Sequence, residues 1–113
     1  MKKNKVSSKE LNDFISENFR YRADFIRCFE VQTGQKMSNG YLSGLLSGKK
    51  GISGITSAAF WLYIQHHERR INAIKCMLLD CMSADQIDAE IKDISALMGQ
   101  GLSDQKIYDK IAW

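Results

Sequence analysis

The chain of 113 residues contains no proline. A β protein of this length needs many tight turns, and proline is one of the residues that such turns use most. Its absence therefore favours long helices joined by glycine and serine. Apolar residues also recur at intervals of three and four along much of the chain, which is the spacing of an amphipathic helix. We expect an all-α protein, a compact bundle of about six helices.

Capping residues and glycines predict where these helices begin and end. Ser7 and Glu10 have the spacing of a capping box, and Gly34 and Gly48 are typical helix stops. Ser83 and Ser103 precede two similar C-terminal segments and predict a helix start in each. The first four helices are expected at residues 8–19, 22–33, 38–47 and 56–81.

The expected fourth helix carries an apolar stripe over about three heptads. Such a stripe suits either a core helix packed by the chain's own helices or the seam of a dimer, and the sequence leaves both open. If it is a seam, the subunit contact consists of Ile64, His67, Ile71, Ile74 and Leu78. Beyond Cys76 this helix is apolar almost all round, so the two C-terminal helices are expected to cover it.

Charge is distributed unevenly along the chain. Residues 1–60 carry ten Lys and Arg against five Asp and Glu, whereas residues 61–113 carry six against eight. The first half is therefore the one to search for a polyanionic partner. The longest apolar run, residues 58–64, is too short to span a membrane, and the basic start leads into no apolar segment of a signal peptide. We expect a cytoplasmic protein without a membrane partner.

Cysteines and histidines give no sign of catalytic or metal chemistry. The three cysteines, Cys28, Cys76 and Cys81, match no recognised zinc spacing and are expected to be small buried apolar side chains. The two histidines, His66 and His67, lie in mid-helix among polar and charged residues. No glycine-rich phosphate loop or pair of catalytic carboxylates stands out. We expect no enzyme, no cofactor and no metal.

The third helix separates into two unlike faces when it is wound at 100° per residue. Tyr41, Leu42, Leu45 and Leu46 form an apolar anchor, while the opposite side consists of serines and glycines. Two glycines in a short helix cost about 1 kcal/mol each relative to alanine. Close contact with a partner would offset that cost. The partner is either DNA, with the helix in its groove, or another protein helix. Basic residues before the second helix (Arg20, Arg22) and after the third (Lys49, Lys50) favour DNA.

The segment from Ser38 to Ser53 resembles the third helix and following loop of Cro/lambda-repressor-like helix-turn-helix proteins. A serine begins the helix, Leu42 and Leu45 stand where that family has aliphatic anchors, and a Gly-Lys-Lys loop follows. The resemblance extends over about residues 8–66 and is specific over residues 37–53. It implies that Met37 is buried just before the helix. It also implies that the groove is faced by Ser38, Asn39, Gly40, Ser43, Gly44 and Ser47.

Two features depart from that family. The segment at residues 29–36 is longer than the family's turn between the second and third helices. The surface predicted to face the groove also lacks arginine and glutamine, the usual bidentate readers of guanine and adenine, and only Asn39 could pair with adenine. Specificity would then depend on DNA shape, on a loop or on dimer symmetry.

These patterns predict a small sequence-specific DNA-binding transcriptional regulator with a helix-turn-helix core. Residues 1–66 are expected to bind double-stranded DNA, and residues 67–113 to form a helical extension for dimerisation. A homodimer is expected because one short module with few base-reading groups seldom gives useful specificity alone. The alternative is a protein-interaction module, such as a phage- or plasmid-type inhibitor or adaptor, that uses a similar surface on a protein partner.

Overall fold

The computed structural model describes residues 5–49 and 51–113. Within these residues the chain is all-α, as predicted, and contains six helices and no strand. They are α1 (Ser8–Asn18), α2 (Arg22–Thr33), α3 (Asn39–Leu46), α4 (Gly54–Leu78), α5 (Ala84–Gly99) and α6 (Asp104–Ala112). None of these helices is long and apolar enough to cross a membrane.

Most predicted helix ends are confirmed by their caps. Ser7 and Glu10 form the expected capping box, and the hydroxyls of Ser83 and Ser103 accept backbone hydrogen bonds at the starts of α5 and α6. Gly34 ends α2 with a φ of 76°, a left-handed conformation that glycine adopts readily. The fourth helix was expected at residues 56–81, but it begins at Gly54, behind a Ser53 cap, and ends at Leu78.

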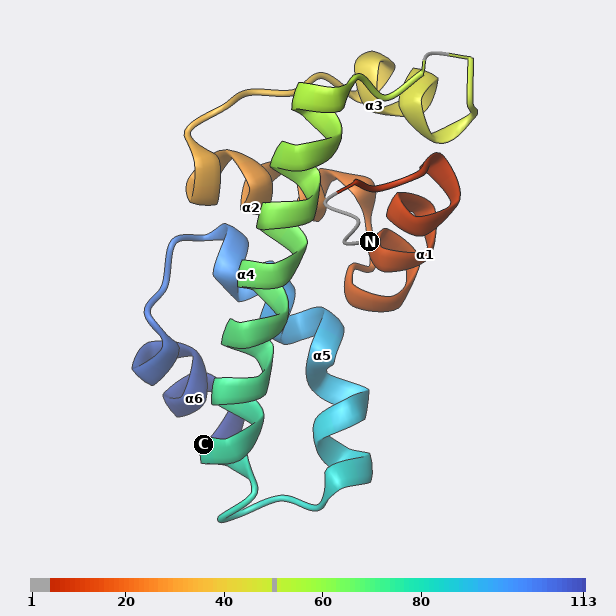
Figure 1. The fold of residues 1–113 in the computed structure, drawn as a ribbon. Coiled ribbons are helices and arrows are strands. Elements are labelled where there is room, and N and C mark those ends of the chain that lie inside the picture. The colour runs from red at the N-terminus through yellow and green to blue at the C-terminus, as the bar shows by residue number, and fades with distance from the viewer. Residues whose placement is uncertain (1–4, 50) are drawn as a thin grey trace.

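Helix α4 is the central rod of the molecule (Figure 1). Helices α1, α2 and α3 lie beside its N-terminal half and leave one face of it open, and α5 and α6 lie beside its C-terminal half. From the end of α4 the chain turns back, so that α5 runs up to α2 and packs against α1, α2 and α4. Helix α6 packs against α4 and α5. The predicted extension and the predicted DNA-binding part therefore contribute to one continuous core.

The prediction that the α4 stripe forms a subunit seam is wrong for four of its five residues. His67, Ile71, Ile74 and Leu78 are buried within a single chain, in which α4 packs against α2, α5 and α6. They are therefore intramolecular core, the first of the two alternatives that the sequence left open. Ile64 differs, because it is only partly buried. Beyond Cys76 the expected cover by the two C-terminal helices is incomplete, because Leu79 is 56% exposed.

One of the three cysteines lies in the core and two lie on the surface. Cys28 is buried in the core, as predicted, but Cys76 and Cys81 are exposed. Their prediction as buried residues is wrong. The buried stripe of α4 passes through Ile74 and Leu78, on the other side of the helix from Cys76, and Cys81 lies in the turn after the end of α4.

One glycine allows α5 to approach α2 closely. At Gly99 an added Cβ would lie 3.4 Å from both the carbonyl oxygen of Asp24 and the backbone nitrogen of Cys28. A longer side chain would extend into the backbone of α2, so the small size of Gly99 permits this helix contact.

Candidate nucleic-acid interface

Helix α3 is held to the rest of the protein by its apolar face. Leu42, Leu45 and Leu46 are buried, and α3 packs against α1 and α2. The hydroxyl of Ser8, at the start of α1, donates a hydrogen bond of 2.7 Å to the carbonyl oxygen of Leu45. These contacts fix the orientation of a helix too short to be stable alone. The predicted anchor is therefore confirmed for its three leucines.

Tyr41 does not belong to that buried anchor. Its side chain is 38% exposed and lines a groove between α3 and α4 instead. Helix α3 begins at Asn39 and is capped by Ser38, whose hydroxyl accepts a 3.0 Å hydrogen bond from the Tyr41 backbone amide. Met37, expected to be buried, is partly buried against the core.

The opposite face of α3 is exposed and has small side chains. Ser38, Asn39, Gly40, Ser43 and Ser47 are exposed, and a Cβ added at Gly40 would meet no atom within 4 Å. Gly44 is intermediate in exposure. A surface of this kind lets a partner come close to the helix backbone, since few side-chain atoms stand in the way.

The basic residues predicted to flank α3 behave differently from one another. Arg22 reaches α3, where its Nη1 donates a 3.0 Å hydrogen bond to the Ser43 hydroxyl. Arg20 instead forms a 2.7 Å ion pair with Asp93 on α5, and this bond raises the pKa of Arg20. Lys49 is exposed just beyond the end of α3. Lys50 lies outside the described residues. The structure thus brings Arg22 and Lys49 to α3, but not Arg20.

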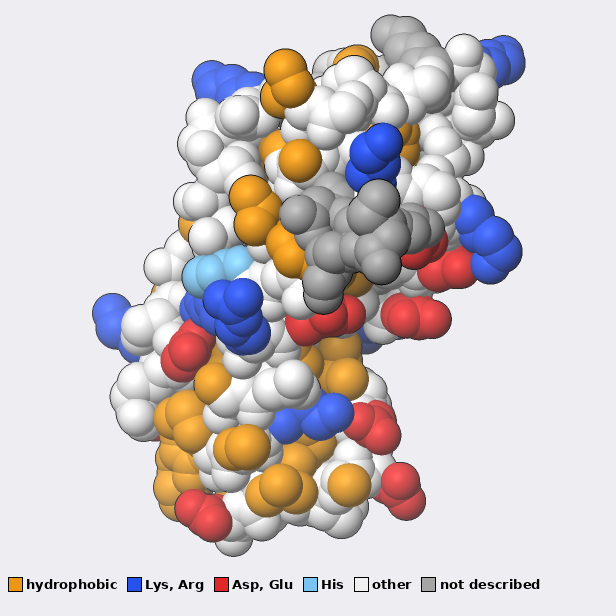
Figure 2. All heavy atoms as spheres, viewed as in Figure 1, with side chains coloured by type: hydrophobic (Ala, Val, Ile, Leu, Met, Phe, Trp, Pro, Cys, Tyr) orange, Lys and Arg blue, Asp and Glu red, His pale blue; other side chains and the backbone are white. Residues whose placement is uncertain are grey.

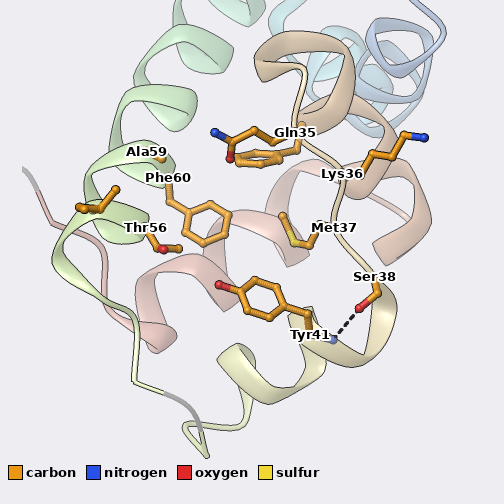
Figure 3. Close-up of a pocket in the computed structure, with 10 residues that line it drawn as sticks. Gln35, Lys36, Met37, Ser38, Tyr41, Thr56, Ala59 and Phe60 are labelled. Atoms are coloured by element: carbon orange, nitrogen blue, oxygen red, sulfur yellow. Dashed lines mark hydrogen bonds between the residues drawn. The ribbon is translucent and has the colours of Figure 1, made fainter.

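The connection between α2 and α3 contains a residue that the sequence analysis did not select. It spans residues 34–38, and within it Lys36 is exposed one residue before Met37. Figure 3 shows the Lys36 side chain extending away from the groove, whereas Met37, Tyr41 and Phe60 point into it. Its place next to the N-terminus of α3 adds a third described cation to the surroundings of the helix.

The groove itself lies between the α2–α3 connection and the start of α4 (Figure 3). It has a volume of about 430 Å³. Its apolar lining comes from Phe29, Met37, Tyr41, Ile55 and Phe60. Sequence periodicity did not reveal it, because its residues come from four separate segments of the chain.

A second group of polar residues is buried between α2, α4 and α5. His67 Nε2 lies 3.0 Å from the Ser95 hydroxyl, and its Nδ1 lies 4.0 Å from the Cys28 sulfur. Burial and the nearby Arg70 lower the pKa of His67 to about 4, while burial raises the pKa of the Cys28 thiol. At neutral pH the imidazole is therefore uncharged and the thiol protonated. Because both side chains are buried, this cluster links three helices rather than facing a substrate.

Comparisons of the chain with known protein families, with curated proteins and with solved structures found no match.

Proposed function

We propose that this chain is a small sequence-specific DNA-binding transcriptional regulator that acts as a dimer, with α3 as the element that enters the DNA groove. The observation that carries the proposal is the contrast between the two faces of α3. Its leucines are buried, whereas the side made of serine, asparagine and glycine is exposed. A rigidly held helix with a small polar face can approach the base edges closely.

Cations around this face support DNA as the partner. Arg22, Lys36 and Lys49 come from the start of α2, from the α2–α3 connection and from the end of α3. Cations placed around a groove-entering helix can contact phosphates on both sides of the groove and so fix its position. The small side chains of α3 give weak direct readout, so DNA shape and the pairing of two half-sites would supply the rest of the specificity.

The alternative function is a protein-interaction module, and one observation favours it. The apolar groove of about 430 Å³ opens beside Tyr41, at the edge of the same helix. A protein partner could place an apolar side chain there while it contacts α3. Its affinity would change little with salt, because the contact would not depend on phosphate groups.

Selection from random DNA duplexes at low and moderate salt tests the proposed function. We expect enrichment of a short motif and an affinity that falls steeply with ionic strength, by about 0.9 in log–log slope for each phosphate contact. Lys49→Ala should reduce that slope by about one unit without changing the preferred motif. Arg20→Ala is the matched control, since it removes the same charge from a residue paired with Asp93. Absence of any enriched duplex at low salt would refute the proposal.

A further inference from the structure

The N-terminal half of α4 has an exposed apolar face that no other part of the described chain covers. Ile55 is 87% exposed and Leu62 is 61% exposed, although both side chains are large and apolar. These residues are seven apart and therefore lie on the same side of the helix, with Ala58 and Ala59 between them. Figure 2 shows apolar side chains following this half of α4 on the visible surface. We name Ile55, Ala58, Ala59 and Leu62 the outer stripe.

The order of side chains in the outer stripe is the same from either end. Large residues lie at both ends, and two small residues lie in the middle. If a second α4 lies antiparallel across it, with a two-fold axis between Ala58 and Ala59, Ile55 of each copy faces Leu62 of the other. The alanines at the crossing let the two helices come close, while the large residues pack on either side.

The hollows beside the stripe have the shape that such a contact needs. The apolar groove is lined by Ile55 and Ala59, and a smaller hollow of about 210 Å³ is lined by Ala59 and Leu62. The exposed large side chains therefore lie next to cavities that can receive the same side chains from another copy. A projection and a cavity on one surface are what a self-complementary two-fold contact requires.

Charge also favours a second copy on this face. None of the described residues that line the two hollows is acidic; Lys36 extends away from the groove, and His66 lines the smaller hollow. A two-fold contact here would bury no pair of like charges. On another side of α4, a groove beside Ile64 is lined by Glu10, Asp13, Glu17 and Glu68 together with Lys5, so a two-fold contact there would bring together an excess of carboxylates.

We propose that two copies of this chain associate through the outer stripe, with their α4 helices antiparallel and Ile55 of each copy packed against Leu62 of the other. This inference rests on the dimer that the proposed function invokes, and it replaces the buried stripe of α4 as the subunit contact. Its tests use no DNA. A monomeric chain that still binds a duplex would refute this surface and the dimer but leave DNA binding through α3 standing. A dimer that binds no duplex would refute the DNA function alone.

Sedimentation of wild type and charge variants tests the arrangement. The wild type should be a dimer that dissociates on dilution. Ile55→Glu and Leu62→Lys should each give a folded monomer, because both positions are exposed in the single chain. The double variant Ile55→Glu with Leu62→Lys should recover the dimer, because the antiparallel contact sets each glutamate against a lysine of the other copy. A parallel contact would instead set like charges together.

Leu79→Glu changes a leucine that is 56% exposed at the far end of α4, and it should remain dimeric. Should Leu62→Lys unfold, as circular dichroism would reveal, Leu62→Ser replaces it and should weaken the dimer at least tenfold. A wild type that stays monomeric at about 1 mM overturns the proposal. So does a dimer that survives Ile55→Glu, or a double variant that stays monomeric.

Discussion

Arg70 on α4 holds Asp104 at the start of α6 through two nitrogens of its guanidinium. Its Nε lies 2.8 Å and its Nη2 2.7 Å from Oδ1 of Asp104, and Nη2 also donates a 3.0 Å hydrogen bond to the carbonyl oxygen of Leu102. The Arg70 side chain is 22% exposed, so water screens this contact only in part. One side chain thus fixes both the first turn of α6 and the chain that leads into it.

Replacement of Arg70 by lysine should loosen α6. An ammonium cannot reproduce the planar set of donors that reaches two acceptors at once. We expect Arg70→Lys to lower the free energy of unfolding by about 1–2 kcal/mol, measured by urea denaturation. Lys9→Ala is the control, because its ion pair with Asp13 is largely exposed and contributes little. Equal effects of the two substitutions would contradict this account of α6.

Ile74 should behave as a core residue rather than as a subunit contact. It is fully buried, in the stripe of α4 that α5 and α6 cover. Ile74→Ala should reduce the free energy of unfolding by about 3 kcal/mol, since it leaves a cavity. Ile74→Glu should abolish folding, as judged by circular dichroism. A folded, monomeric Ile74→Glu variant would restore the seam interpretation.

The buried His67 should make the protein less stable as the pH falls. Its pKa is lowered from 6.5 to about 4 in the native state, so the unfolded chain takes up a proton that the folded chain excludes. This part of the stability is complete above pH 6.5 and is lost progressively as the pH falls to about 4, by roughly 3 kcal/mol.

Two histidine variants separate this effect from general acid denaturation. His67→Gln should be less stable than the wild type at pH 7, yet lose less further stability between pH 6.5 and pH 4. His66→Gln keeps the buried imidazole of His67 and should still lose most of this stability as the pH falls. Unfolding by urea at a series of pH values measures both. A wild-type profile in His67→Gln would show that another group governs the loss.

Gly40 offers a test of whether α3 enters the DNA groove. Its backbone is not in the left-handed region, and a Cβ there would meet no atom within 4 Å. Gly40→Leu should therefore fold, with slightly higher stability from the gain in helix propensity. The longer side chain should nevertheless reduce duplex affinity at least tenfold by obstructing close approach. Ala84→Leu, at an exposed position in the first turn of α5, is the control. Unchanged affinity in Gly40→Leu would exclude this face of α3 from the groove.

Local sequence patterns were sufficient to predict the six helices. A capping serine acts within three residues of itself, and helical periodicity reports the buried face of a single helix. The Ser7 capping box, the Gly34 stop and the buried leucines of α3 were predictable for that reason. The same patterns predicted that one face of α3 is exposed and has small side chains, but they carry no information on what binds there.

Contacts between distant segments were decided only by the tertiary structure. Periodicity shows that one stripe of α4 is buried but not by which helix, so the sequence could not distinguish a core that contains His67 from a dimer seam. Nor could it indicate that Arg20 pairs with Asp93, 73 residues away, or that Gly99 lies against the backbone of α2. Such pairings depend on how whole helices pack to remove apolar surface from water, a property that no local segment contains.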